Sequence, residues 1–439
     1  MTGRARVAAV LALGAIVALP ATVRAQPAAG GVTQVRLDNG LTVLVRENPV
    51  APVVAVALLV RMGTRWETRE TAGLSNFVHA IMVKGTARRT GSDLAEAVAG
   101  LGGKISASGE IDYSGIQGTA LGRFWRELLE LTAELVLEPT LAAEEVDRER
   151  EWLLGRIQRR RDNAPSRAFD EYYATLYGAH PYSIPSLGTA ESLKRIDHAA
   201  IVAAYRRFYR PERMVLAVSG QVSAPEVLAQ ARRLFGGMAP GGAAVDPVIP
   251  PPVAAAHREI VEQPANQTQI VAGGLAPSLT HPDHAAVKVL STVLGGGMAG
   301  RLFVELRDKS ALAYTATAYY DPVREPGTLI LYLGTAPDNG ARAEEALLRE
   351  VRRVQAEAVS DDELRRAKAY VIGRYAMDRR TNERQAWYLA FYEVEGAGLD
   401  YPERFRRAVE AVTAADILRA ARTYLAPLTT VILGPRASR

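Results

Sequence analysis

A glycine- and proline-rich segment divides the chain into two parts of similar length. Residues 236–252 contain four glycines and end in Pro250-Pro251-Pro252. Such a segment can neither continue a helix nor pair as a central strand, so it is expected to be an extended linker. We therefore predict a half over residues 26–235, a linker over 236–257 and a second half over 258–439.

The two halves resemble each other in the order of their local patterns. A helical pattern, a proline and a short apolar strand follow one another in each half, at Ile201, Pro211 and Val215–Val218 and again at Ile417, Pro427 and Val431–Leu433. A second match joins Leu154-Gly155-Arg156 to Ile372-Gly373-Arg374. Chance similarity of amphipathic helices could produce one match, but two matches in the same order favour a duplication. Each half mixes strands with long helices, which predicts an α+β fold.

Several local elements of the first half can be predicted from residue spacing. Asp38-Asn39-Gly40 is a strong turn signal between two apolar strands, and the β-branched run from Val53 to Met62 indicates a buried strand. Apolar residues at helical spacing predict a helix over Thr71–Lys84. A second helix is expected to start at a Ser92 cap and to stop at Gly102-Gly103.

The N-terminus has the pattern of an export signal. Arg4 and Arg6 precede an apolar stretch over Val7–Leu19, and Val23-Arg24-Ala25 offers a cleavage site before Gln26. We therefore expect residues 1–25 to be a signal peptide and the protein to be exported, to the periplasm; the alternative is a retained membrane anchor. The chain has no cysteine, so an exported form is held together by core burial. Its charges are mixed, which gives no indication of nucleic-acid binding.

The segment Gly73–Thr86 carries a specific resemblance. It is similar to the zinc helix of the pitrilysin/insulinase family of inverted zinc metallopeptidases, in which His-x-x-Glu-His is followed by an apolar pair and Lys-Gly-Thr. Two histidines at i and i+4 share a helix face and can hold one zinc ion. The glutamate between them can take a proton from zinc-bound water, and a later helix supplies a third, glutamate ligand.

This chain departs from the motif at each of these positions. Asn76 and Ala80 stand where the two histidines belong, and His79 stands where the glutamate belongs. Aligned on Glu149-Arg150, the third ligand position falls on Arg156. A guanidinium about 4 Å from a divalent ion would be repelled by roughly 8 kcal/mol at an effective dielectric near 20. The resemblance thus predicts that no metal or other cofactor is bound by this chain.

The remaining residues of this region are expected to have structural roles. His79 is interpreted as a helix residue bonded to a neighbouring group, with a metal ligand as the alternative. Glu149 is expected to form a salt bridge, with Arg156 as the candidate partner. Outside this region, His180 is expected in a structural turn, and His281 and His284 are expected at a helix start or on the surface rather than on a metal.

The second half retains the other signature of the family. The glycine loop Gly295-Gly296-Gly297 precedes Arg307 and, seven residues further, Tyr314. In the family, this arginine and tyrosine contact the substrate backbone, where they can donate hydrogen bonds to a carbonyl oxygen that gains charge during attack. The alternative from residue type alone is an ion-paired Arg307 and a Tyr314 in the core.

The resemblance implies a fold and a function. The fold is two homologous halves, each an antiparallel or mixed sheet with long helices on one side, around a chamber. The function is that of a non-catalytic, peptide-binding subunit of a heterodimeric zinc metallopeptidase, which supplies Arg307 and Tyr314 to substrate at the zinc of a homologous partner subunit. Two alternatives are a peptide-binding scaffold without any catalytic role and an active metalloendopeptidase with an atypical metal site at His79.

Overall fold

The first sheet of the protein is built from strands that precede residue 221. A computed structural model describes residues 26–28, 31–242 and 246–435. In this part of the chain the first sheet has seven strands in the order β1-β2-β3-β7-β4-β6-β5. Only the β3–β7 pair is parallel. The strands are β1 (Gln26–Ala28), β2 (Val32–Arg36), β3 (Thr42–Glu47), β4 (Val53–Val60), β5 (Lys104–Gly109), β6 (Ser114–Leu121) and β7 (Met214–Gly220).

The second sheet repeats the arrangement of the first. Its order is β10-β11-β9-β12-β8, with one parallel pair, β8–β12, and antiparallel neighbours elsewhere. Strand for strand, this order matches β5-β6-β4-β7-β3 of the first sheet. The strands are β8 (His257–Glu262), β9 (Thr268–Ala276), β10 (Thr315–Asp321), β11 (Gly327–Thr335) and β12 (Thr429–Gly434). The predicted α+β fold of two similar halves is confirmed.

One face of each sheet is covered by helices of the same half. In the first half these are α1 (Leu74–Met82), α2 (Gly91–Gly100), α3 (Trp125–Leu137), α4 (Ala143–Asp162), α6 (Ala190–Arg195), α7 (His198–Phe208) and α8 (Ala224–Phe235). In the second half they are α9 (His284–Gly295), α10 (Gly340–Ala356), α11 (Asp361–Asp378), α13 (Tyr401–Ala411) and α14 (Ala414–Tyr424). A π-helical segment, Phe303–Lys309, follows α9.

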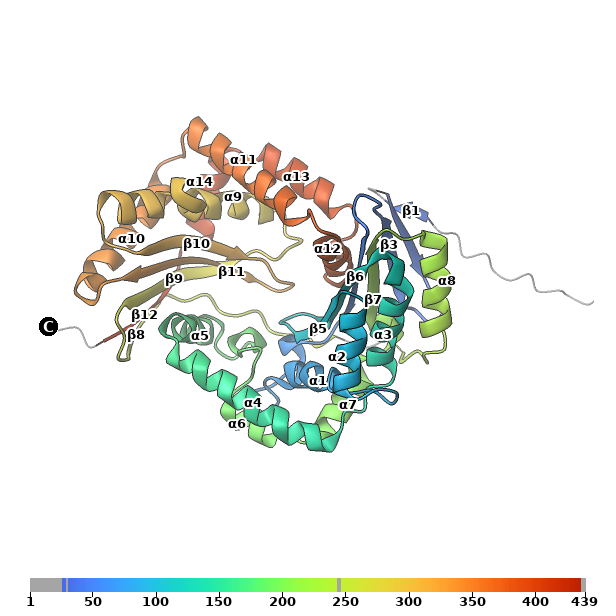
Figure 1. The fold of residues 1–439 in the computed structure, drawn as a ribbon. Coiled ribbons are helices and arrows are strands. Elements are labelled where there is room, and N and C mark those ends of the chain that lie inside the picture. The colour runs from blue at the N-terminus through green and yellow to red at the C-terminus, as the bar shows by residue number, and fades with distance from the viewer. Residues whose placement is uncertain (1–25, 29–30, 243–245, 436–439) are drawn as a thin grey trace, which may run out of the picture.

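The opposite face of each sheet is covered by a helix from the other half. Helix α5 (Ala164–Tyr177) packs on β9 and β12, and α12 (Asn382–Val394) packs on β4 and β7. Figure 1 shows α5 below the second sheet and α12 beside the first. This exchange explains why β4 is an unbroken apolar run: alternate residues face the helices of their own half and α12. The sequence predicted helices on one side only.

The predicted local elements agree with the structure except at one cap. The hairpin, the buried strand and the helix predicted over Thr71–Lys84 are present as β2–β3, β4 and α1. Helix α2 is capped by Thr90, which forms a reciprocal capping box with Asp93, and not by Ser92. A Ser92 cap would have left the helix without the acid three residues later that completes such a box.

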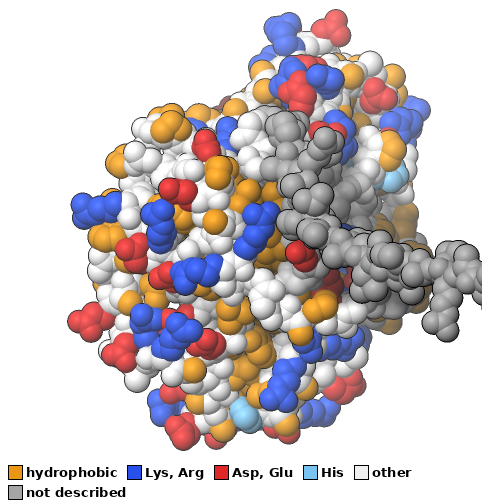
Figure 2. All heavy atoms as spheres, turned by 90° about the vertical axis from the view of Figure 1, so that its right-hand side faces the viewer, with side chains coloured by type: hydrophobic (Ala, Val, Ile, Leu, Met, Phe, Trp, Pro, Cys, Tyr) orange, Lys and Arg blue, Asp and Glu red, His pale blue; other side chains and the backbone are white. Residues whose placement is uncertain are grey.

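Three further expectations concern the N-terminal segment, membrane-spanning helices and the distribution of surface charge. The predicted signal segment 1–25 lies outside the described residues. In the part of the chain that the structure describes, no helix has both the length and the apolar character needed to span a bilayer. On the face shown in Figure 2, basic and acidic side chains are intermixed, without an area of a single sign. This agrees with the mixed charge along the sequence.

Candidate functional site

Helix α1 is held at its start by a buried carboxylate. Glu67 accepts hydrogen bonds from the backbone N–H groups of Gly73 (2.8 Å) and Ser75 (2.6 Å), which satisfies two donors of the first turn. Gly73 has a φ of 86°, and a Cβ there would lie 2.6 Å from the carbonyl oxygen of Leu187. Only glycine fits at this helix start. The orientation of α1, and so of His79, is therefore fixed by its surroundings.

His79 is a fully buried residue with both ring nitrogens engaged. Nδ1 lies 2.7 Å from the carbonyl oxygen of Ser75, and Nε2 lies 2.6 Å from the hydroxyl of Tyr209. Because a carbonyl oxygen only accepts, Nδ1 carries the hydrogen and Nε2 accepts from Tyr209. Burial lowers the pKa of His79 to about 4, so the ring is neutral at pH 7. No nitrogen lone pair remains for a metal ion.

The positions that correspond to zinc ligands offer no alternative ligand set. Asn76 and Ala80 are half-buried on α1, and the guanidinium of Arg156 on α4 stacks over the ring of Trp152 at 4.8 Å. Among the described residues, no group of three or more histidine, aspartate or glutamate side chains could hold a metal ion. The residues present here do not fit the zinc ion that the resemblance would place between α1 and α4.

Glu149 forms a salt bridge, but with a different partner from the one expected. Its carboxylate lies 2.8 Å from the ammonium of Lys84 and is buried, whereas Arg156 makes the contact with Trp152. Lys84 directly follows α1, and Glu149 lies on α4. The ion pair therefore ties the two helices that would carry a zinc site. The expectation of an Arg156 partner is corrected: Lys84 neutralises this carboxylate.

The free edge of the first sheet passes directly beside α1. Strand β5 is the last strand of the sheet, and an ideal Cβ at Gly109 would lie 2.7 Å from the backbone nitrogen of Asn76. The glycine thus allows the strand edge and the first turn of the helix to approach closely. An extended peptide that paired with this edge would run next to Asn76.

The arginine and tyrosine of the second half are both exposed. Arg307, in the π-helical segment, lies over the ring of Phe303 at 4.8 Å, and no described carboxylate lies within ion-pair distance of it. Tyr314 is 66% exposed, directly before β10. Arg307 therefore forms no ion pair with a described carboxylate, and Tyr314 does not pack in the core, although residue type alone allowed both. Both are free to donate hydrogen bonds to a ligand.

The glycine loop closes the end of α9 against β10. A Cβ at Gly295 would collide with the backbone nitrogen of Ala318, and Gly297 has a φ of 74°. Both positions therefore require glycine for backbone reasons. Gly296 caps α9. The loop positions the π-helical segment that carries Arg307, which is a structural explanation for its composition.

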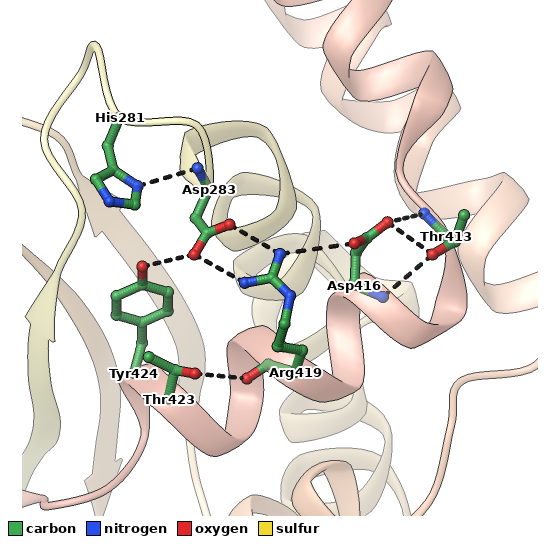
Figure 3. A network of polar contacts seen from close by, with 7 residues as sticks. All are labelled: His281, Asp283, Thr413, Asp416, Arg419, Thr423 and Tyr424. Carbon is green, nitrogen blue, oxygen red and sulfur yellow. Dashed lines mark hydrogen bonds and ion pairs between the residues drawn. The ribbon is translucent and has the colours of Figure 1, made fainter.

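Three other histidines, His180, His281 and His284, have structural roles, and His284 is more deeply buried than expected. The Nδ1 atom of His180 accepts from the N–H of Tyr182 at 3.2 Å, as expected for a turn. Figure 3 shows the start of α9, where His281 accepts from the N–H of Asp283 and Asp283 binds Arg419 of α14 through two contacts. His284 is the first residue of α9, as expected for a helix start, but it is buried in the core and does not lie at the surface.

The partners of these residues could not be found from the sequence. Tyr209 contacts His79 across 130 positions of the chain, and no local pattern links the two residues. His284 is hydrogen-bonded to Tyr320 and Tyr401, from β10 and α13. Only Lys288 could have been singled out from the local sequence, because it is the one lysine, arginine or carboxylate residue of α9.

Comparisons with known proteins identify the family. The model described as Insulinase (Peptidase family M16) matches residues 42–190, and the one described as Peptidase M16 inactive domain matches residues 195–371. An uncharacterized zinc protease of Rickettsia bellii is 26% identical over 91% of this chain and 97% of that protein. One of Mycobacterium tuberculosis is 28% identical over 96% of this chain and 97% of that protein.

Solved structures share the fold. A peptidase M16 inactive domain from Pseudomonas fluorescens has a TM-score of 0.86 at 24% identity, covering 93% of this chain and 99% of its own. A protease from Helicobacter pylori has a TM-score of 0.87 at 22% identity, with 92% of this chain and 99% of its own covered. The two family models match in chain order and together cover about three quarters of the sequence. The protein therefore belongs to the insulinase, or M16, family of peptidases.

Proposed function

We propose that this protein is a non-catalytic, peptide-binding subunit of a heterodimeric zinc metallopeptidase. The observation that carries the proposal is the state of His79, whose two nitrogens are bonded to Ser75 and Tyr209 inside the core. The relatives are named zinc proteases, yet in this chain Asn76, Ala80 and Arg156 occupy the positions of the three zinc ligands. Zinc is accordingly expected on a homologous partner subunit.

The contribution of this chain to such a complex is Arg307 and Tyr314. Both are exposed and lie at the two ends of the segment that leads into β10. A guanidinium and a phenol can donate hydrogen bonds to a peptide carbonyl whose oxygen gains negative charge when the partner's zinc-bound water attacks. The free edges of β5 and β10 provide backbone groups to hold an extended peptide with little sequence preference.

Peptidase assays with and without a partner test this proposal. The isolated chain should cleave no peptide. Mixed with a homologue that carries an intact His-x-x-Glu-His motif, it should raise peptidase activity, and Arg307→Ala should lower the kcat of the mixture by about a hundredfold, as for loss of an oxyanion donor. Lys309→Ala removes a charge from the same segment and should leave the activity of the mixture unchanged.

The outcomes separate the possible functions. If the mixture gains no activity although the two chains associate, the protein is a peptide-binding scaffold. Chelator-sensitive cleavage by the isolated chain would show an active endopeptidase with a metal at His79, and the proposal would be wrong. We also propose export to the periplasm; N-terminal sequencing of the protein from its native host should find Gln26 at the start.

A further inference from the structure

The second half contains a cavity between α9, β10, α11 and α12. Its volume is about 620 Å³, which suits a ligand of the size of one or two amino-acid residues. Much of its wall is aromatic, with ring-bearing side chains from β10 and three helices, namely Tyr319, Tyr320, Tyr375, Trp387, Phe391 and Phe405. The rings of Trp387 and Phe391 stack at 4.7 Å with an angle of 12° between their planes. The cavity therefore offers flat apolar surfaces to a ligand.

This cavity occupies the place where the second half repeats the corner between α1 and α4. Helix α9 follows β9 as α1 follows β4, and the matching strand orders of the two sheets make the two helices counterparts. Ile372-Gly373-Arg374 on α11 repeats Leu154-Gly155-Arg156 on α4. Arg374 is thus the counterpart of Arg156, and Lys288 faces it from α9.

Cationic groups without an ion-pair partner line the cavity. Neither Lys288 nor Arg374 has a described carboxylate within ion-pair distance. Two carboxylates are present: Asp321 has no described ion-pair partner, and Asp378 is bound by Arg384 at 2.6 Å and by the hydroxyl of Tyr388. With Arg384 counted, three cations stand against two carboxylates, so the cavity and its rim keep an excess of one positive charge.

Burial disfavours the charged form of Lys288, an effect that a bound anion would offset. Burial lowers the pKa of its ammonium; Asp321 opposes this effect, and the nearby guanidinium of Arg374 adds to it. A bound carboxylate between the two cations would favour their charged forms. The hydroxyl of Tyr320 is already used by the carbonyl oxygen of Pro277 and by His284, so this ring presents mainly its apolar surface.

We propose that the cavity binds a carboxylate that adjoins an aromatic ring, with Lys288 and Arg374 on the carboxylate and the ring between the aromatic side chains. The C-terminal residue of a peptide that ends in phenylalanine has this chemistry, and so does a small aromatic acid. A peptide end as the natural ligand rests on the proposed function, whereas binding of an aromatic carboxylate does not. Bound there, a peptide end would lie beside β10, next to the segment that carries Arg307 and Tyr314.

Binding to the isolated full chain tests the cavity independently of any partner. The probes are an unlabelled octapeptide that ends in Phe with a free carboxylate, the same peptide with a C-terminal amide, and N-acetyl-phenylalanine as competitor, with binding measured by isothermal titration calorimetry. The free acid should bind at least about tenfold more tightly than the amide, since a charge-assisted contact is lost. Displacement of the peptide by N-acetyl-phenylalanine would show that the cavity recognises the carboxylate and the neighbouring ring.

Matched variants connect the binding to the two cations. Lys288→Gln and Arg374→Gln should each weaken binding of the free acid by about tenfold and leave binding of the amide unchanged. Arg366→Gln removes an exposed charge from the same helix outside the cavity and should change neither value. Lys288→Arg keeps the charge and should retain most of the affinity. Thermal melts verify that each variant is folded.

Each outcome of these binding measurements supports or overturns the proposed carboxylate site. Equal binding of acid and amide, or unchanged binding in both glutamine variants, would overturn the proposal. Binding of N-acetyl-phenylalanine without binding of the peptide supports the cavity and assigns it to small aromatic acids. The binding experiment contains no partner subunit. Failure of the proposed heterodimer would therefore appear only in the peptidase assay, as a mixture without added activity, and would leave the binding affinities unchanged.

Discussion

At the scale of single residues, the burial and the hydrogen bonds of His79 distinguish the first half of this protein from a zinc-binding half. In a zinc peptidase of this family, the helix that contains residues 76–80 presents its polar side chains to a metal. Here His79 is directed into the core and completes hydrogen bonds with Ser75 and Tyr209. Arg156 stacks on an exposed tryptophan, and Glu149 neutralises Lys84. Residues at catalytic positions have thus become parts of a stable core and its surface.

Removal of the Tyr209 hydroxyl tests the hydrogen bond to His79. Tyr209→Phe leaves Nε2 buried without a donor and should lower the free energy of unfolding by about 1–3 kcal/mol in urea titrations. The matched control is Tyr370→Phe, because Tyr370 is partly exposed and its hydroxyl makes no described hydrogen bond; a change below about 0.5 kcal/mol is expected. Equal effects of the two substitutions would show that the bond contributes nothing.

Acid should destabilise the protein through the same residue. The pKa of His79 is lowered to about 4 from an ordinary value of 6.5, so between these pH values the unfolded chain binds a proton that the folded protein does not. The free energy of unfolding should therefore fall as the pH decreases from 6.5 towards 4. His79→Gln should remove this part of the pH dependence. An identical pH profile of the variant would contradict the assignment of a neutral, buried ring.

At the scale of secondary-structure elements, the exchanged helices join the two halves. The face of α12 that packs on the first sheet includes two small buried residues, Ala386 and Ala390, which allow close contact with β4 and β7. Helix α5 places Tyr172 and Leu176 against β9 and β12 in the reciprocal contact. Each half thus completes the core of the other, and neither sheet is covered on both faces by its own helices.

Overpacking at this contact should destabilise the molecule. Ala390→Leu adds volume where no space is available and should cost about 1–3 kcal/mol in the free energy of unfolding, measured by chemical denaturation. Ala369→Leu places the same side chain on an exposed position of α11 and serves as the control, with little expected change. Unchanged stability of Ala390→Leu would mean that α12 is not tightly packed on the first sheet.

Most elements could be predicted from local patterns, whereas their partners could not. Turn residues and apolar periodicity predicted the hairpin of β2 and β3 and the helices α1 and α2 within a few residues. The zinc-motif departures were visible at residues 76–80 because that motif is local. Lys84 as the partner of Glu149, the burial of His284 and the helix exchange depend on contacts between distant segments, which periodicity does not encode.

At the scale of the whole molecule, buried acidic groups lie where the halves meet. Asp112, between β5 and β6, accepts hydrogen bonds from the N–H of Arg324 (3.0 Å) and from the hydroxyl of Tyr182. Glu395, which follows α12, has one carboxylate oxygen without a described hydrogen-bond partner. Burial, and then the charge of Asp112, raise the pKa of Glu395 to about 8, against the opposing charges of Arg324, Arg61 and Arg65.

Raising the pH from about 4.5 to 8 should therefore weaken the molecule through Glu395. Between pH 4.5 and about 8 the folded protein holds a proton that the unfolded chain has released, so the free energy of unfolding should decrease as the pH rises through this window. Glu395→Gln keeps the neutral form and should gain about 4 kcal/mol relative to the natural protein between pH 5 and pH 9, since one pKa unit corresponds to about 1.4 kcal/mol. Glu357→Gln, at an exposed site, should show no such gain. A parallel pH profile for Glu395→Gln and the natural protein would contradict the raised pKa.

The most direct test of the central claim is the zinc content of the isolated, folded chain, measured by mass spectrometry of the metals after dialysis against zinc-containing buffer. Because both nitrogens of His79 are bonded and Asn76, Ala80 and Arg156 stand at the positions of the three zinc ligands, we predict far less than one zinc ion per chain. One tightly held ion per chain that is lost in His79→Ala would contradict the account.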